Sequence, residues 1–296
     1  MRQTLRYRMN EISFTKMHGL GNDYIYIHCP ANEPHSLSEL SIEMSQRHTG
    51  VGGDGIILIE PSDVADFRMR IFNADGSEAK MCGNGSRCVG KYVYDHNLTA
   101  KRTITLETLA GIRTLELHVD GASGKVESVT VDMGAPVFEP EEVPVRAASR
   151  VVNAPVPTSM GELHMTAVSM GNPHGVIFLP TLAGLPINDI GPELECHEMW
   201  PDRANIEFAA IAGPDVIEMQ VWERGSGVTM ACGTGACATA VAAVLNGLTG
   251  KEVTVKLPGG DLKVEWREDG HVYMTGPATE VFNGIYKRRN DSTYTR

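Results

Sequence analysis

The chain has 296 residues, of which 42% are hydrophobic and 21% charged, as in an ordinary globular protein large enough for two hydrophobic cores. Its formal net charge is −11, and no basic stretch is interleaved with aromatic residues, so neither nucleic acid nor an anionic membrane is an expected partner. No run of eighteen apolar residues predicts a membrane span. The first 14 residues lack the apolar segment of a secretory signal, so we expect a cytoplasmic protein.

Cysteines are too sparse here for a disulfide-built scaffold, and without an export signal we expect them to be reduced. They are Cys29, Cys82, Cys88, Cys196, Cys232 and Cys237. Five residues separate Cys82 from Cys88 and four separate Cys232 from Cys237, which is not the spacing of a structural zinc site. We therefore expect no metal. We expect the four cysteines other than Cys82 and Cys232 to act as small apolar residues, which is the usual role of a buried cysteine.

Taken in chain order, most of the sequence predicts short strands separated by turn residues. The predicted strands cover 14–28 with a turn at 19–23, then 56–60, 67–72, 102–109, 113–119, 125–133, 151–157, 164–169, 205–211, 216–222, 251–257, 261–266 and 271–275. A helix is predicted at 37–47, with Ser36 or Ser38 as its cap. Two further helices are predicted directly after Cys82 and Cys232. The tail from Lys287 onward is polar and is expected to fray.

A glycine-rich stretch after the first predicted helix matches the spacing of a dinucleotide-binding motif. Gly50, Gly52 and Gly55 form the pattern G-x-G-x-x-G. That motif requires a preceding strand and a following helix, whereas here a helix precedes and a strand follows. We therefore interpret these glycines as a tight turn from helix to strand and expect no nucleotide cofactor.

The sequence contains an internal repeat with an offset of 150 residues. Residues 69–98 and 219–248 align without a gap, which pairs Cys82 with Cys232, and Gly21-Asn22 pairs with Gly171-Asn172 at the same offset. Two homologous halves are therefore predicted. The expected fold is mixed α/β (α+β), with two pseudo-symmetric domains that are each a mostly antiparallel sheet curled around a central helix. Residues 236–245 are apolar on all sides, as a helix inside a sheet requires.

We assign the first domain to residues 1–124 plus 279–296 and the second to 125–278, with the active site expected in the cleft between them. Each repeat places a cysteine before Gly-x-Gly and the start of a helix. The first N–H groups of a helix attract anions, and they favour the thiolate form of a nearby cysteine. Two such thiols on opposite faces of one anionic ligand suit inversion at a carbon acid, in which one removes the α-proton and the other supplies a proton. This chemistry needs no pyridoxal cofactor.

Several long motifs around these cysteines resemble the diaminopimelate epimerase family. They are KMHGLGNDYI, IFNADGSEAKMCGNGSRC, SMGNPHG, ANIEF, WERGSGVTMACGTGA and GPATEVFNG, and the resemblance extends from about Phe14 to Ile285. The resemblance implies a fold of that family and a cofactor-independent interconversion of LL- and meso-2,6-diaminopimelate, in lysine and peptidoglycan-precursor biosynthesis. It also implies a homodimer.

The resemblance assigns Cys82 and Cys232 as the acid/base pair, and His174 and Glu223 as residues that tune their pKa values. It also implies a set of substrate contacts: Asn22, Asn73, Gly83, Asn84, Asn172, Asn205, Glu223, Arg224, Gly233 and Thr234. A substrate with two amino-acid ends explains this set, because a guanidinium can grip the carboxylate of the end that does not react. Asparagines can act as donors and acceptors toward the other groups.

The chain departs from the family pattern at three positions, and two other functions stay open. Gly55 stands where a Gln is common, Val228 where a Glu is common, and Phe282 where a Tyr associated with dimer contacts is found.

One alternative function is an epimerase or racemase of the same fold that acts on another amino acid, although the proline racemase branch carries other residues around its cysteines. The other is a non-catalytic protein that binds thiols or a metal.

Overall fold

The computed structural model describes residues 11–31 and 33–288, and the chain divides into two compact units. The described residues of the first unit lie in 11–19, 23–127 and 278–288, and those of the second in 20–22 and 128–277. Two predictions lie outside the described residues: the absence of an export signal, for the first ten residues, and the frayed tail, for the residues after 288.

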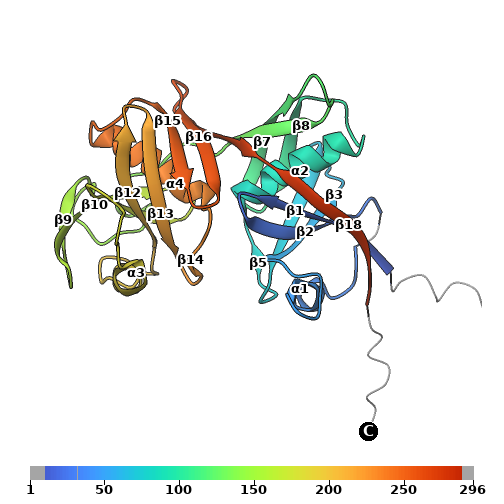
Figure 1. Cartoon of the computed structure of the whole chain (residues 1–296), viewed down its shortest axis with the longest axis horizontal. Helices are drawn as coiled ribbons and strands as arrows, with labels where there is room; N and C mark the ends of the chain where they lie inside the picture. The colour runs from blue at the N-terminus through green and yellow to red at the C-terminus, as the bar shows by residue number, and fades with distance from the viewer. Residues whose placement is uncertain (1–10, 32, 289–296) are drawn as a thin grey trace, which may run out of the picture. The chain divides into compact units, whose positions relative to one another are not determined.

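The first unit is a single sheet with two helices (Figure 1). Its elements are β1 (Glu11–Gly19), β2 (Asn22–His28), α1 (Leu37–Ser45), β3 (Gly55–Glu60), β4 (Phe67–Asn73), β5 (Glu78–Ala79), α2 (Gly83–Asp95), β6 (Thr103–Thr108), β7 (Gly111–Val119) and β18 (Thr279–Lys287). The strands pair in the order β18-β1-β2-β3-β4-β6-β7, and the short β5 pairs with β4. The pairs β2/β3 and β4/β6 are parallel.

The second unit repeats this arrangement and extends its sheet by two strands. Its elements are β8 (Val126–Asp132), β9 (Ala154–Thr158), β10 (Gly161–Ser169), β11 (Pro173–Phe178), α3 (Ile187–Glu195), β12 (Asn205–Gly213), β13 (Val216–Glu223), β14 (Gly227–Val228), α4 (Gly233–Leu245), β15 (Glu252–Leu257), β16 (Gly260–Trp266) and β17 (Val272–Pro277). The order is β9-β10-β11-β12-β13-β15-β16-β17-β8, and β14 pairs with β13. The additional strands are β17 and β8, and the first two residues of β8 fall in the first unit. The pairs β11/β12 and β13/β15 are parallel.

The strand register confirms the internal repeat residue by residue. Ile25 lies opposite Ile56 across β2/β3, and Gly175 lies opposite Ile206 across β11/β12, an offset of 150 on both strands. The same offset relates α1 to α3 and α2 to α4. After the helices it falls to 149, since Ile104 on β6 corresponds to Val253 on β15. The second half is therefore one residue shorter just past α4.

Strands β3 and β12 are buried on both faces because a helix covers each face. On β12, Ile206 and Phe208 pack in a core with Ile190 of α3, so the alternate residue Glu207 faces α4. Helix α4 contacts β10 to β13 and β15 to β17, and its residues 235–243 are all buried (Figure 1). This confirms the prediction that the apolar helix after Cys232 lies inside its sheet.

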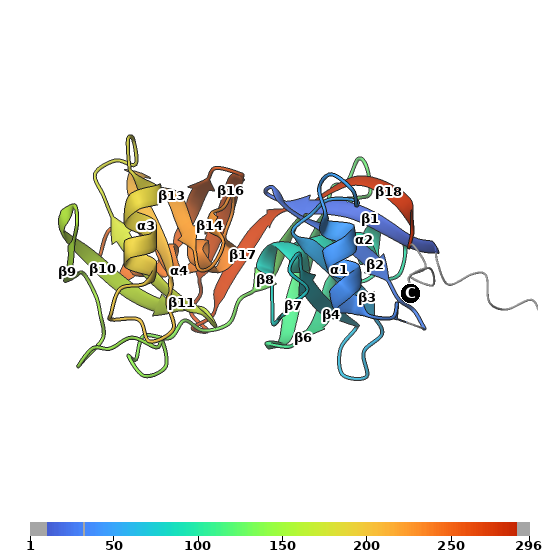
Figure 2. The ribbon, with the colours of Figure 1, turned by 90° about the horizontal axis from the view of Figure 1, so that it is seen from below.

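Five elements escaped the sequence prediction: β11, β18, α3 and the two-residue strands β5 and β14. Helix α3 contains Gly191 and Pro192, which normally argue against a helix. A Cβ on Gly191 would lie 2.6 Å from the ring of Trp222, so a glycine is required where this helix packs on β13 (Figure 2). The predicted cap Ser36 does precede α1, but its side chain makes no capping hydrogen bond.

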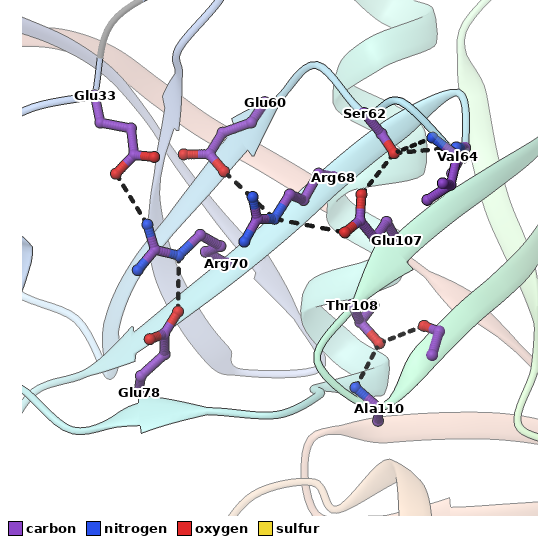
Figure 3. Close-up of polar contacts among 12 residues, drawn as sticks. Glu33, Glu60, Ser62, Val64, Arg68, Arg70, Glu78, Glu107, Thr108 and Ala110 are labelled. Atoms are coloured by element: carbon purple, nitrogen blue, oxygen red, sulfur yellow. Dashed lines mark hydrogen bonds and ion pairs between the residues drawn. The ribbon is translucent and has the colours of Figure 1, made fainter.

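Charged residues cover one face of β4, as Figure 3 shows. The two ion-pair groups are Glu60–Arg68–Glu107 and Glu33–Arg70–Glu78. Arg68 and Arg70 share this face because side chains alternate along a strand, while Met69 and Ile71, which alternate with them, are buried in the core. Burial, and then the charges of Glu60 and Glu33, raise the pKa of Cys29 to about 12, so this thiol stays protonated at neutral pH. We assign this face a structural role.

Within the part of the chain that the structure describes, no helix combines the length and the apolar character needed to cross a membrane.

Candidate functional site

Each of the two cysteines is the N-cap residue of a buried helix. Cys82 precedes α2 and Cys232 precedes α4, and both have extended backbone angles. The Cys82 sulfur accepts a hydrogen bond from the Gly85 N–H at 3.3 Å, and the Cys232 sulfur accepts one from the Gly235 N–H at 3.4 Å. Both sulfurs therefore lie at the partially positive end of a helix, where developing negative charge is stabilised. The sequence predicted this placement, and the structure confirms it.

The second unit adds negative charge around its cysteine. Cys232 is 5% exposed, and burial, followed by the charges of Glu223 and Glu207, raises the pKa of its thiol well above the ordinary value. This direction is opposite to the one that the helix N-terminus alone predicts. The hydrogen bond with Thr234 Oγ1 and the one that the Gly235 N–H donates both act to lower this pKa, but they do not outweigh the burial and the carboxylates. This direction favours the protonated thiol of Cys232 over its thiolate.

Several residues of the resemblance set occupy equivalent positions in the two units. The equivalent pairs are Asn22 with Asn172, Asn73 with Glu223, Cys82 with Cys232, Gly83 with Gly233, and Asn84 with Thr234. Asn73 ends β4 and its Nδ2 donates to Ser77 Oγ, while Glu223 ends β13 and accepts from Thr229 Oγ1. Each of these side chains thus closes the turn that leads to its cysteine.

The other predicted residues have no counterpart in the first unit. Asn205 corresponds to Gly55, Arg224 to Ala74, and His174 to Tyr24. The second unit therefore carries extra polar groups around its cysteine, whereas the first unit has small or aromatic residues at those positions.

Asn205 is a buried link between three segments of the second unit. It begins β12, is 2% exposed, and its Nδ2 donates to the Pro173 carbonyl at 3.1 Å. Its Oδ1 accepts the main-chain N–H of Arg224 at 2.9 Å. The Arg224 side chain then points away from the core, where Nη1 donates to the Asp202 carbonyl at 3.0 Å. Asn205 therefore fixes the backbone from which a half-exposed guanidinium extends.

Two buried carboxylates that sequence reasoning missed support this region. Glu207 on β12 lies 2.7 Å from His174 Nδ1, and His174 Nε2 lies 3.0 Å from Asn172 Oδ1. Both Glu207 and His174 are fully buried. Because the charge of Glu207 acts on the Cys232 thiol, Glu207 connects His174 electrostatically to Cys232. Glu195 of α3 accepts from Trp222 Nε1 at 2.7 Å and from the Gly225 N–H at 3.0 Å, which anchors the turn after Arg224.

A signal for Glu207 was present in the sequence. It lies in a predicted strand whose neighbouring residues are mostly apolar, and an ionisable residue that is buried among such residues needs a partner or a role. No comparable signal marked Glu195, because the helix that carries it was not predicted.

The turn that carries Asn22 packs within the second unit. A Cβ on Gly259 would lie 2.0 Å from the Leu20 carbonyl oxygen, and Gly21, with φ 87°, adopts a backbone that favours glycine. This close approach explains why the Gly259-Gly260 turn is needed where the Leu20–Asn22 segment meets the second unit.

A cavity of about 520 Å³ has neither cysteine in its lining. It is lined by Ser13, Phe14, Thr15, His28, Tyr92, His96, Asn283, Gly284 and Ile285, and none of the predicted site residues belongs to it. The cysteines, not this cavity, therefore define the candidate site. Among residues 11–31 and 33–288, no group of three or more His, Cys, Asp or Glu side chains has a metal-binding arrangement.

Comparison with known proteins points in one direction. A family model described as diaminopimelate epimerase matches residues 14–139 and 166–281. A protein of that name from Bacteroides thetaiotaomicron is 55% identical over 278 residues, which cover 93% of this chain and 97% of that protein. Another from Methanococcus maripaludis is 52% identical over 275 residues, which cover 92% of this chain and 99% of that protein.

Solved structures share the fold at low sequence identity. A phenazine biosynthesis protein of the PhzF family from Bacillus anthracis superposes with a TM-score of 0.68 at 16% identity, covering 93% of this chain and 98% of that chain. At this identity the likeness shows the fold alone, and it confirms the fold class predicted from the repeat.

Proposed function

The chain belongs to the diaminopimelate epimerase family, and from this premise we propose that it interconverts LL- and meso-2,6-diaminopimelate without a cofactor. The observation that carries the proposal is the pair of cysteines at equivalent helix N-caps, each with its sulfur held by the third residue of the helix. The activity places the protein in lysine and peptidoglycan-precursor biosynthesis.

In the proposed reaction the two thiols act on one α-carbon from opposite faces. The thiolate of one cysteine takes the α-proton and becomes a thiol, and the electron pair of the broken C–H bond stays on the substrate. The thiol of the other cysteine then donates its proton to the opposite face and becomes a thiolate. The configuration inverts, and the two sulfurs have exchanged protonation states, which solvent restores before the next turnover.

The helix N-termini provide the charge stabilisation for this step. We propose that the α-carboxylate of the substrate binds the first N–H groups of the two helices, at Gly83-Asn84 and Gly233-Thr234. Backbone N–H groups aimed at developing negative charge are preorganised, so they lower the barrier without reorganising during the reaction. A pyridoxal group would stabilise the carbanion by delocalising its electron pair into a ring. In the proposed reaction the N–H groups of the helices stabilise the developing charge instead.

The non-reacting end of the substrate would be held mainly by the second unit. Arg224 offers a guanidinium suited to a distal carboxylate, and Asn205 fixes the backbone that carries it. Glu223 can accept from the distal ammonium group. Asn22, Asn73 and Asn172 would supply further donors and acceptors. Because the first unit lacks counterparts of Arg224 and Asn205, a two-ended substrate would bind in one orientation.

The main alternative is an enzyme of the same fold that acts on another amino acid. Purified protein incubated with LL-diaminopimelate and no added cofactor should produce the meso isomer, measured by chiral chromatography. Proline and lysine, offered at the same concentration, should not be epimerised at a comparable rate. Turnover of proline with none of diaminopimelate would overturn the assignment, and failure of every amino acid would favour a non-catalytic thiol-binding protein.

We further propose that the protein works in the cytoplasm, because the reaction needs both thiols reduced and the cytoplasm maintains that state.

We also propose a homodimer formed through strand β18. Among the described strands, β18 pairs with β1, and it exposes Val281, Phe282 and Ile285, each more than two-fifths exposed. The equivalent edge strand of the second unit, β9, carries exposed prolines at 155 and 157, which cannot donate to a further strand. One edge is thus closed by proline while the other exposes apolar side chains, which suits a second copy of the chain.

Replacing Phe282 by Asp should convert the dimer to a monomer, because it places a charge in the apolar centre of the β18 edge. Sedimentation velocity should give the mass of two chains for the natural protein and of one chain for Phe282→Asp. Val64→Asp is the matched control, since Val64 is 66% exposed on a loop of the same unit and should leave the dimer intact. A monomeric natural protein, or a dimeric Phe282→Asp variant, would contradict the proposed interface.

A further inference from the structure

In the second unit, a carboxylate and the cysteine thiol lie against the same residue of α4. A Cβ built on Gly235 would lie 2.5 Å from Glu207 Oε1 and 3.2 Å from Cys232 Sγ. Glu207 faces α4 because it alternates along β12 with Ile206 and Phe208, which face α3. The first turn of α4 therefore packs directly on a charged side chain.

In the first unit, a hydrocarbon side chain occupies the position equivalent to Glu207. A Cβ built on Gly85 would lie 2.7 Å from Ile57 Cδ1 and 3.6 Å from Cys82 Sγ. Ile57 and Glu207 are equivalent by the offset of 150, and the two glycines are equivalent as well. The two cysteines thus share one backbone geometry but differ in the group beneath their helix, which is apolar for Cys82 and acidic for Cys232.

Glu207 is unusual in its own surroundings. Its side chain is fully buried, and its Oε1 is bonded to His174 Nδ1. No donor among the described residues reaches its Oε2. A buried carboxylate oxygen without a donor is costly, so a purely structural role would favour an apolar residue, as in the first unit. This cost points to a role in the chemistry of the site.

Few other ionisable groups face this cysteine. From β11 comes His174, paired with Glu207, and from the end of β13 comes Glu223, whose carboxylate also raises the Cys232 pKa. In the described strands β10, β15, β16 and β17, which also contact α4, no buried side chain is ionisable. At the repeat position of Glu223 the first unit has the uncharged Asn73.

We propose that Glu207 is a positioning residue that holds Cys232 as a thiol in the resting protein. A thiolate at Cys232 would face a buried carboxylate, and this repulsion favours the protonated sulfur. The consequence for catalysis, which rests on the proposed function, is that Cys232 is the resting proton donor and Cys82 the resting base. The effect on Cys232 titration does not depend on which substrate the enzyme uses.

The test is the titration of the two thiols in the intact protein carrying ¹³C-labelled cysteine Cβ atoms, followed by NMR. Glu207→Gln keeps the shape of the side chain but removes its charge. We expect the apparent pKa of Cys232 to fall by about one unit or more, which is roughly a tenfold increase in thiolate at a given pH below the pKa. The pKa of Cys82, on the other unit's helix, should stay the same.

Glu218→Gln is the matched control, because Glu218 is exposed on β13 and its replacement removes the same charge from the same unit. If Cys232 titrates alike in Glu207→Gln and Glu218→Gln, or if both thiols shift equally in Glu207→Gln, the proposal is wrong. If Glu207→Gln does not fold, Glu207→Asp replaces it in the test, because it withdraws the carboxylate by one methylene. This variant should lower the pKa of Cys232 by a smaller amount. An unchanged Cys232 pKa in Glu207→Asp would also overturn the proposal. Diaminopimelate turnover of the natural protein tests the proposed function separately.

Discussion

Replacing either Cys82 or Cys232 by alanine is expected to lower kcat/KM for diaminopimelate epimerisation by about a thousandfold or more. A general acid or base contributes roughly 10²–10⁴-fold, and inversion in either direction needs one cysteine as base and the other as acid. Both variants should bind substrate, since the helix N–H groups and Arg224 are retained. Steady-state kinetics in both directions, measured on each variant, provide the check.

The same helices contain matched controls. Cys88 on α2 and Cys237 on α4 are fully buried, and neither is an N-cap. Cys88→Ala and Cys237→Ala should keep most of the activity, because these thiols act as small apolar side chains. Near-normal turnover by either Cys82→Ala or Cys232→Ala would contradict the two-base mechanism.

Replacing Arg224 by Met is expected to lower kcat/KM for LL-diaminopimelate by about 10²–10³-fold. Each hydrogen bond to a charged group contributes roughly 1.5–3 kcal/mol, and a guanidinium can make two to a carboxylate. In the structure Arg224 Nη1 bonds the Asp202 carbonyl, so the side chain must exchange this contact for the substrate. The loss should appear in kcat/KM measured at low substrate concentration.

A substrate that lacks the distal carboxylate separates this role from a structural one. Any slow α-proton exchange of lysine should be unaffected by Arg224→Met, because lysine has no second carboxylate for Arg224 to bind. Arg203→Met serves as the control, since Arg203 is a nearby exposed arginine that pairs with Glu195. An equal loss with lysine and diaminopimelate would show that Arg224 acts on the fold of the site and not on the distal end.

The repeat made most of the fold predictable. The helices after Cys82 and Cys232, and the strands before them, lie where the aligned stretches predicted them. Helix α3 was missed because Gly191 and Pro192 conceal it. The repeat could have revealed it, because the predicted helix at 37–47 shifted by 150 residues falls on 187–197. Strand β18 has no such partner in the aligned stretches, and its exposed apolar residues do not alternate as a half-buried strand requires.

Electrostatics at the site were harder to predict than geometry. The sequence indicates a helix N-terminus beside each thiol, and that feature alone predicts a lowered pKa. The structure adds burial and the carboxylates of Glu223 and Glu207, which act in the opposite direction on Cys232. Strand alternation turns Glu207 toward α4, and the register between β11 and β12 pairs it with Val176, so that its side chain reaches His174, two residues away on the same face. Such proximity depends on tertiary packing, which spacing along the chain does not reveal.

The most direct test of the two-base mechanism is incubation with LL-diaminopimelate in heavy water, with product configuration and label followed together at early times. The thiol that reprotonates the substrate exchanges with solvent, so the meso product should carry one deuterium at the inverted α-carbon, while recovered LL substrate stays largely unlabelled. Inverted product that retains its original hydrogen would contradict the mechanism, as would label in the substrate without inversion.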